Sequence, residues 1–334
     1  MAGANNREPH VLVVSTMLDL STDAVVRSLG ERGVACTRLN TETFPVESGM
    51  SLTLGVGRAL DSCRLALRRP EASELLPISP TSVWFRRVRI PERGATMPAG
   101  VYDFCVREAR AALVGGLLAQ EVPMMSPPAN VWAAEHKAFQ LQIAQEVGLT
   151  IPQTVITNDP RTVAEAFVAF DRQMIAKPTR SGYVDYGDEQ HAIYTSQILE
   201  EHLEDLDSAK WSPVIYQPLI AKACDVRVTY VAGEMFVAEI DSQTDHTAAI
   251  DWRRTATPDL PHRSSTLPKE LGTKVMQFMA RLGLAYGALD FVRTPSDEYV
   301  FLEVNPNGQW LWLEDRLGFP IARRIADWLS RGSQ

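Results

Sequence analysis

The stretch Phe301-Leu302-Glu303-Val304-Asn305-Pro306-Asn307-Gly308 decides how this chain is interpreted. Glu303 and Asn305 are two positions apart on a predicted strand, so both side chains point to the same face. The preceding apolar run, residues 286–292, carries Asp290, and the intervening residues Thr-Pro-Ser-Asp have the composition of a turn. A hairpin closed around residues 295–298 would place Asp290 directly opposite Glu303.

Such a pairing predicts a cation site. Opposed side chains in an antiparallel pair have Cβ atoms about 4.5–5.5 Å apart. Two carboxylates at that distance repel each other unless a proton or a cation lies between them. With the amide oxygen of Asn305 added, the predicted cluster presents only oxygen ligands. An all-oxygen set suits Mg²⁺ that holds phosphates.

The composition limits the classes of protein that this chain can be. Its 334 residues predict two or three domains, and 45% hydrophobic and 22% charged residues are typical of globular proteins. The net charge of −8 disfavours nucleic acid or an anionic membrane as the main partner. No apolar run approaches the roughly 18 residues that a membrane span needs. The polar residues 1–10 do not resemble a signal peptide.

The spacing of the cysteines and histidines narrows the possible classes of protein further. The four cysteines have no paired or CxxC spacing, which indicates free thiols and a cytoplasmic location. The six histidines never occur at i,i+4 spacing, so a zinc site is not expected.

The pattern of elements indicates an α+β chain with a boundary in residues 122–128, where three prolines favour an extended connection. The chain opens with a βαβ pattern. Asn130 is predicted to cap a helix that carries Lys137 in its middle, and Gly283 to stop another. We predict strands over residues 11–15, 35–39, 82–90, 151–156, 174–177, 214–219 and within 225–240, a hairpin over 51–69, and helices over 19–32, 102–120, 130–148, 162–170, 266–282 and 320–330.

Neither GxGxxG nor GxxxxGK[ST] is present, so a nucleotide would be held in another way. Lys137 on a helix is most simply a surface residue. Lys177 ends an apolar strand, where it either needs an anionic partner to offset its desolvation or points to water from an edge strand. The glycine-containing segment 179–187 could cover phosphates or be an ordinary hairpin tip.

Two further segments are ambiguous in isolation. Residues 215–220, Ile-Tyr-Gln-Pro-Leu-Ile, could receive an adenine through backbone groups and the amide of Gln217, or could be a plain strand end. Asp225 and Arg227 are two positions apart on a predicted strand, so their side chains share one face. Such a pair is usually a simple salt bridge.

The order of these candidates is specific. Residues 129–334 resemble an ATP-grasp domain, and residues 11–128 resemble the small α/β domain that precedes it. The continuation Gly308-Gln309-Trp310-Leu311-Trp312 resembles the signature of the ATP-grasp ribosomal peptide maturases, the microviridin-ligase-like (graspetide) enzymes. Residues 250–253, Ile-Asp-Trp-Arg, and 84–87, Trp-Phe-Arg-Arg, also resemble that group. An aromatic core segment remains an alternative for the Trp-rich continuation.

The resemblance implies a division into a pre-ATP-grasp domain (residues 1–128), a central subdomain (129–213) and a C-terminal subdomain with the metal hairpin (214–334). It also implies a role for each matched residue. Lys137 and Lys177 would contact ATP phosphates, Gln217 and Leu219 the adenine, and Asp225 the ribose region. Asp290, Glu303 and Asn305 would hold Mg²⁺. Arg227 and Arg253 would face the reacting phosphate and the acceptor carboxylate, with Arg254 as the alternative to Arg253.

The implied chemistry is carboxylate activation without a covalent enzyme intermediate. An Asp or Glu side chain of a precursor peptide, with leader and acidic core, attacks ATP to give an acylphosphate. A Ser or Thr hydroxyl or a Lys amine then closes an ω-ester or ω-amide macrocycle. We expect residues 241–263, which hold several basic side chains, to face the peptide, and a homodimer is possible. The rivals are a small-molecule ligase similar to glutathione synthetase and a non-catalytic ATP-binding regulator.

Overall fold

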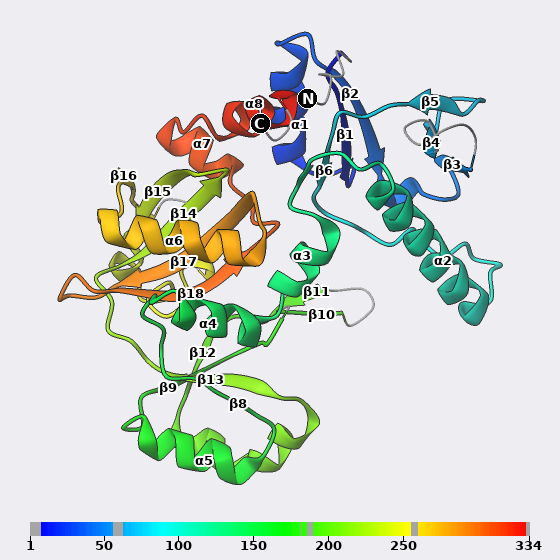
Figure 1. The fold of residues 1–334 in the computed structure, drawn as a ribbon. Coiled ribbons are helices and arrows are strands. Elements are labelled where there is room, and N and C mark those ends of the chain that lie inside the picture. The colour runs from blue at the N-terminus through cyan, green and yellow to red at the C-terminus, as the bar shows by residue number, and fades with distance from the viewer. Residues whose placement is uncertain (1–7, 56–62, 181, 186–189, 255–259, 332–334) are drawn as a thin grey trace. The chain divides into compact units, whose positions relative to one another are not determined.

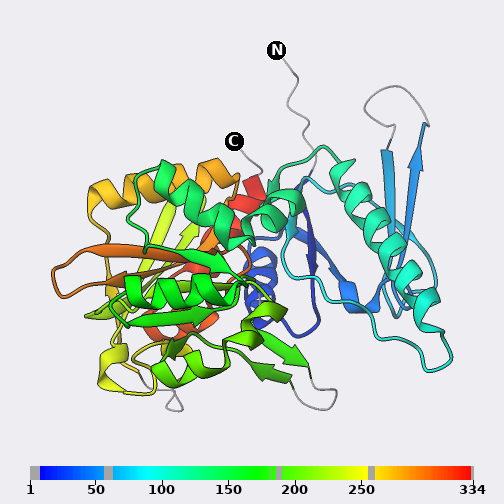
Figure 2. The same ribbon diagram turned by 90° about the horizontal axis from the view of Figure 1, so that it is seen from below.

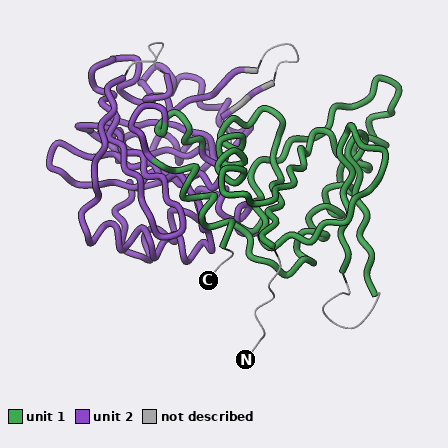
Figure 3. The backbone as a smooth tube through the Cα atoms, turned by 90° about the horizontal axis from the view of Figure 1, so that it is seen from above, with its two compact units in different colours: residues 1–128, 309–314, 320–334 green, residues 129–308, 315–319 purple. Residues whose placement is uncertain are grey.

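The computed structural model describes residues 8–55, 63–180, 182–185, 190–254 and 260–331. The chain divides into two compact units, coloured separately in Figure 3. Unit 1 comprises residues 1–128, 309–314 and 320–334, and unit 2 comprises residues 129–308 and 315–319. The sequence-based division into three parts stays a prediction. Two segments that it assigned to the C-terminal part, 309–314 and 320–334, cluster with unit 1.

Unit 1 is built on a parallel four-stranded sheet in the order β2-β1-β6-β7. Every residue of the segment Val11–Ser15 is buried, as expected for a strand with neighbours on both sides. Helices α1 and α8 lie side by side and pack on this sheet (Figure 1). The bounds are β1 His10–Ser15, α1 Leu20–Gly30, β2 Ala35–Asn40, the 3-10 helix η1 Thr41–Thr43, β6 Ser82–Phe85, α2 Ala99–Leu118, β7 Met124–Met125 and α8 Ile321–Arg331.

The predicted hairpin over residues 51–69 is confirmed. Strands β3 (Gly49–Leu54) and β4 (Cys63–Arg68) pair antiparallel, and β5 (Leu76–Ile78) extends them to a three-stranded sheet. Helix α2 lies near this sheet (Figure 2), and its C-terminal part contacts it, with Gly116 against the side chains of Met50 and Leu52.

Strand β6 is shorter than predicted: it ends at Phe85, whereas the prediction extended it to Ile90. Its partner β1 ends at Ser15, and the last paired residues are Val14 and Phe85, so no strand is left to continue the ladder. Beyond this point Asp19 caps α1 by accepting a hydrogen bond from Thr22.

Unit 2 contains two antiparallel sheets. The four-stranded sheet has the order β12-β9-β13-β8, and the five-stranded sheet has the order β16-β15-β14-β17-β18. The strands are β8 Val155–Thr157, β9 Met174–Lys177, β12 Ser196–Ile198, β13 Val214–Pro218, β14 Cys224–Val231, β15 Glu234–Ile240, β16 His262–Ser265, β17 Tyr286–Arg293 and β18 Tyr299–Asn305, and a separate hairpin is formed by β10 Tyr183–Asp185 and β11 Gln190–Ala192.

Helices α4 and α6 lie side by side on one face of the five-stranded sheet (Figure 1). Their apolar side chains form one core with the sheet, in which Phe301 packs against Phe278 and Phe291. Helix α6 ends at Gly283, whose left-handed φ of 63° confirms the predicted stop. The helices of this unit are α3 Pro128–Ala134, α4 Lys137–Glu146, α5 Pro160–Ala169 and α6 Lys269–Leu282, with 3-10 helices η2 Glu200–Trp211, η3 Ser242–Thr244 and η4 Trp252–Arg254, and α7 Leu311–Leu317 spans both units.

The predicted single helix over residues 130–148 is wrong. The structure has two helices that break at residues 135–136, so Lys137 begins α4 instead of lying in mid-helix. Asn130 is the third residue of α3 rather than a cap, and its amide donates to the carbonyl of Gly283. Strand β8 also begins later than predicted, at Val155, where its pairing with β13 starts.

All four cysteines are free, as expected. Within the described residues, no helix combines the length and the apolar character needed to cross a bilayer.

Candidate active site

The predicted hairpin is confirmed, and it pairs Asp290 of β17 with Glu303 of β18. The connecting turn is closed by the backbone bond from Thr294 N to the carbonyl of Glu298, at 2.9 Å. The register next to the turn, with Phe291 opposite Phe301, differs by one residue from the predicted one. A β-bulge between Asp290 and Phe291 shifts the pairing back, so that Asp290 lies opposite Glu303 as predicted.

Cationic side chains from three other elements surround this pair. Lys137 Nζ lies 2.9 Å from Glu303 Oε2, and Arg227 Nε of β14 lies 3.0 Å from Asp290 Oδ1. Lys177, at the end of β9, is only 8% exposed. The structure thus brings together, from separate strands and a helix, five of the residues that the sequence assigned to one site.

The surroundings shift the pKa values of the two carboxyl groups in opposite directions. Burial raises the pKa of Asp290, and the charge of Glu303 adds to this effect while Arg227 opposes it. Burial alone would also raise the pKa of Glu303, but Lys137 and Lys177 lower it below its ordinary value. Burial lowers the pKa of Lys177 to about 8, against the favourable charge of Glu303. Pairs of groups with opposite shifts are frequent at functional sites.

The donor set fits Mg²⁺. Asp290 and Glu303 are opposed carboxylates, each with about one fifth of its side chain exposed, and a divalent cation would relieve the repulsion that raises the pKa of Asp290. Asn305 follows on the same face and is exposed. Its Oδ1 accepts a hydrogen bond from Asn307 N at 2.9 Å, which leaves capacity for a second interaction.

Arg253 adds a further positive charge from the loop that follows β15. Its guanidinium forms two parallel hydrogen bonds to Asp251, from Nε at 2.8 Å and from Nη2 at 2.7 Å. Asp251 is 5% exposed and also accepts a bond from Thr195 N. These hydrogen bonds raise the pKa of Arg253, and its charge contributes to lowering the pKa of Glu303. A two-pronged pair of this kind fixes the plane of the guanidinium.

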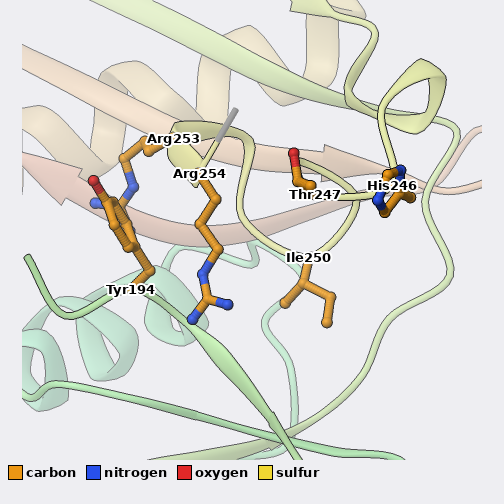
Figure 4. A pocket seen from close by; sticks show the side chains of 6 residues that line it. All are labelled: Tyr194, His246, Thr247, Ile250, Arg253 and Arg254. Carbon is orange, nitrogen blue, oxygen red and sulfur yellow. The ribbon is translucent and has the colours of Figure 1, made fainter. Parts of the chain in front are cut away.

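Arg253 and Arg254 also line an open pocket of about 520 Å³ (Figure 4). Both guanidinium groups lie near the ring of Tyr194, at 5.9 and 5.7 Å from its centroid. Figure 4 shows Tyr194 beside the two arginines, with Ile250, Thr247 and His246 completing the lining. The pocket therefore combines an aromatic face with positive charge, which suits an anionic group carried on an organic chain.

The expected adenine residues lie on β13 and just after it. Gln217 is 1% exposed, and its Nε2 donates to Thr154 Oγ1 at 2.9 Å. The backbone N–H of Leu219 donates to the carbonyl of Gln173 at 2.7 Å. One N–H of the Gln217 side-chain amide is therefore engaged within the protein.

Asp225 is placed next to a lysine that the sequence reasoning did not single out. Lys222 Nζ lies 2.7 Å from Asp225 Oδ2 and 3.3 Å from the carbonyl of Ile250. The hydroxyl of Ser242 also donates to Asp225, which is 6% exposed. No sequence signal marks Lys222 beyond its position three residues before Asp225, because an i,i+3 pair is common outside functional sites.

The expected phosphate-covering segment, 179–187, lies partly outside the described residues. Its described part contains β10, which forms a hairpin with β11. Its proposed role is therefore not tested.

Comparisons with known proteins agree with the family that the sequence motifs resemble. Residues 10–130 match the model of the MvdD pre-ATP grasp domain. None of the curated proteins matches the chain significantly in sequence.

Three solved structures illustrate the structural similarity. A RiPP-associated ATP-grasp ligase from Chryseobacterium gregarium, in complex with ADP and a leader and core peptide, has a TM-score of 0.88 and 26% identity, over 97% of each chain. The macrocyclase MdnC from Microcystis aeruginosa MRC, bound with the precursor peptide MdnA, has a TM-score of 0.85 and 30% identity, over 96% of this chain and 99% of that chain. The ATP-grasp ligase PsnB, complexed with minimal precursor, Mg and ADP, shares the fold at a TM-score of 0.75 and 20% identity, over 96% of each chain. With 30% identity across nearly the whole of MdnC, the chain belongs to the family of ATP-grasp ligases that mature ribosomal peptides.

Proposed function

We propose that this chain is an ADP-forming macrocyclase that uses ATP and Mg²⁺. It activates Asp or Glu side chains of a precursor peptide as acylphosphates and closes ω-ester rings with Ser or Thr, or ω-amide rings with Lys. The observation that carries the proposal is the convergence of Lys137, Lys177 and Arg227 on the opposed carboxylates Asp290 and Glu303.

The first step brings two anions together, a substrate carboxylate and the terminal phosphate of ATP. Mg²⁺, when bound, neutralises phosphate charge and orients the phosphates. In our proposal Lys137 and Lys177 bind the phosphates, and Asp290, Glu303 and Asn305 hold the cation. The buried position of Lys177 makes its charge more effective, because little water screens it.

Two arginines complete the reacting centre. Arg227 is 8% exposed and is held against Asp290, so it can act on the reacting phosphate without reorganising. Arg253 is oriented by Asp251, and we assign it to the acceptor carboxylate. Arg254 donates to the hydroxyl of Ser196 and belongs to the pocket wall.

For the nucleotide base, we propose contacts to backbone groups of the segment Gln217–Leu219 and to the Gln217 amide, which keeps hydrogen-bonding capacity beyond its bond to Thr154. Asp225 remains a proposed ribose neighbour that shares its carboxylate with Lys222 and Ser242.

The peptide partner is proposed to be acidic near the ring-forming residues. His246, Arg253 and Arg254 contribute basic groups to the pocket of about 520 Å³, although the whole chain carries a net charge of −8. Such a local basic patch can attract an acidic segment to an otherwise acidic protein. A homodimer stays a prediction from the family resemblance, and light scattering coupled to gel filtration measures it.

The test is ADP release, with Mg²⁺ and ATP, in the presence of a candidate precursor peptide whose mass is followed. We expect one ADP and the loss of one water mass for each ring formed. Glu303→Gln should abolish both signals, whereas Glu298→Gln, in the exposed turn of the same hairpin, should leave them unchanged.

The other outcomes discriminate the rivals. ADP release with free amino acids but without peptide mass loss would assign a small-molecule ligase. Nucleotide binding without any turnover would assign a regulator. Sensitivity of the product to mild base would separate ester from amide rings.

A further inference from the structure

One buried amide outside the proposed reacting groups contacts the strand that carries the metal ligands. Gln140 lies on α4 and is 2% exposed. Its Nε2 donates to the carbonyl of Val304 at 2.9 Å, and its Oε1 accepts from the N–H of Val304, also at 2.9 Å. Val304 lies between Glu303 and Asn305. The amide thus bonds both backbone groups of the residue between the two proposed ligands.

The position of β18 explains why these bonds are needed. β18 is the last strand of the five-stranded sheet and, within the described part of the chain, pairs with β17 alone. An edge strand leaves alternate N–H and C=O groups without a strand partner, and buried groups of this kind must be satisfied in another way. Gln140 satisfies them at Val304, and the carbonyl of Thr150 accepts from Phe301 N at 2.8 Å. The side chain therefore acts as a one-residue substitute for a neighbouring strand.

The same amide also compensates the break between α3 and α4. Its second N–H donates to the carbonyl of Ala134, the last residue of α3. A carbonyl at a helix end lacks an intrahelical partner. Gln140 therefore uses both donors and its acceptor on backbone groups, which makes a buried amide tolerable in this apolar core.

Lys137 lies one helical turn before Gln140 on α4, so the two side chains project to the same side. Lys137 is held by Glu303 at 2.9 Å and by the carbonyl of Pro178 at 3.0 Å. One turn of α4 therefore contacts β18 twice, once through charge at Glu303 and once through the amide at Val304.

We infer that Gln140 is a positioning residue, which holds β18 in place against α4 so that Glu303 and Asn305 present their oxygens to Mg²⁺. This inference rests on the metal site of the proposed function. It predicts that loss of the amide weakens the contribution of Mg²⁺ to nucleotide binding, although the hydrogen bonds of the Gln140 amide go to backbone groups of the protein.

The test uses Gln140→Met, which keeps the length and apolar volume of the side chain but removes all three hydrogen bonds. Gln142→Met is the matched control, because Gln142 is on the same helix, is exposed and bonds only Glu146 among the contacts that the structure gives it. ADP binding to the full chain is measured by calorimetry at increasing Mg²⁺ concentrations and without Mg²⁺.

We expect Gln140→Met to require about tenfold more Mg²⁺, or more, for the same ADP affinity, as for other residues that orient metal ligands. Its affinity for ADP without Mg²⁺ should be unchanged, and Gln142→Met should match the wild type in both measurements. A purely structural role would lower the midpoint of thermal unfolding and leave the Mg²⁺ dependence unchanged, which would overturn the inference. Gln140→Asn, which keeps the amide but withdraws it by one methylene, serves the same purpose should Gln140→Met not fold.

The two proposals fail in different ways. A wild-type chain whose ADP binding does not respond to Mg²⁺ would overturn the metal site and this inference with it. A wild type that responds, together with a Gln140→Met variant that responds equally, would overturn only the role of Gln140.

Discussion

Arg86 donates a hydrogen bond from Nη2 to Oε1 of Gln309 at 3.2 Å, although the two residues are 223 positions apart. Ser21 donates to the same oxygen at 2.7 Å. Arg86 belongs to the Trp-Phe-Arg-Arg motif and Gln309 to the Gly-Gln-Trp motif, so two sequence signatures with no evident connection meet in unit 1. Gln309, the residue after Gly308, thus belongs to a different unit from strand β18, which precedes it.

The Arg86 side chain should be a large contributor to the stability of unit 1. It pairs with Asp19 at 2.7 Å, and both side chains are fully buried. Arg86→Leu should lower the free energy of unfolding by about 3–5 kcal/mol, because it leaves a buried carboxylate without its cationic partner. Denaturant unfolding followed by tryptophan fluorescence measures this loss.

The control for that prediction is Arg89→Leu, which changes an exposed arginine in the same segment and should have little effect. The double variant Asp19→Leu, Arg86→Leu should recover part of the lost stability, because it removes both charges. A double variant that is less stable than Arg86→Leu would contradict this account.

The Asp19–Arg86 pair also predicts a pH dependence. Burial alone would raise the pKa of Asp19, but Arg86, Ser15 and Thr22 hold it below its ordinary value. A carboxyl group whose pKa is lower in the folded state adds stability above its unfolded pKa of about 3.9, and this stability is lost as the pH falls through the folded value. The stability difference between wild type and Asp19→Asn should therefore be present at neutral pH and shrink in acid below about pH 4. A difference that grows on acidification would refute the assignment.

Arg253 and Arg254 should differ strongly in their effect on turnover. Both side chains are exposed, but Asp251 holds Arg253 through two hydrogen bonds, whereas Arg254 bonds the hydroxyl of Ser196. We expect Arg253→Ala to lower kcat by roughly 10²–10³-fold, as for other groups preorganised toward developing charge. Arg254→Ala should raise the KM for peptide with a much smaller change in kcat. Steady-state ADP formation at varied peptide concentration distinguishes the two, and equal effects would remove the distinction.

Gly308 should not tolerate a side chain. A Cβ at this position would lie 2.4 Å from Cβ of Ala288 and 3.5 Å from Nη1 of Arg227. Because the methyl group of Ala288 cannot rotate away, Gly308→Ala should displace the backbone after Asn305 and cost about 1–3 kcal/mol of stability. Gly115→Ala, at an open helical position, is the control and should be neutral or stabilising. Thermal unfolding and ADP formation are the measurements, and a Gly308→Ala variant with normal values in both would contradict the close packing.

Much of the candidate metal site could be predicted from local pattern. The alternation of Glu303 and Asn305, the apolar run around Asp290 and the turn between them specified the hairpin. The exact pairing of Asp290 with Glu303 also depends on a β-bulge between Asp290 and Phe291, which no local pattern signals. The end of α6 at Gly283 and the short strand before Pro178 were equally local. The helix break before Lys137 could not be predicted from local pattern, because residues 135–136 include neither glycine nor proline. The break is stabilised by hydrogen bonds of Gln140 to the carbonyls of Ala134 and Val304.

By itself the sequence determined the α+β pattern, the hairpin that carries the two carboxylates and the order of basic residues that resembles a family, because these depend on neighbours within one element or one hairpin. Only the tertiary structure decided which charges meet. It paired Lys137 with Glu303, Arg253 with Asp251 and Asp225 with Lys222, and it placed α8 with unit 1. The strength of a charge depends on the burial and the partners that folding provides, and strand periodicity carries no information about either.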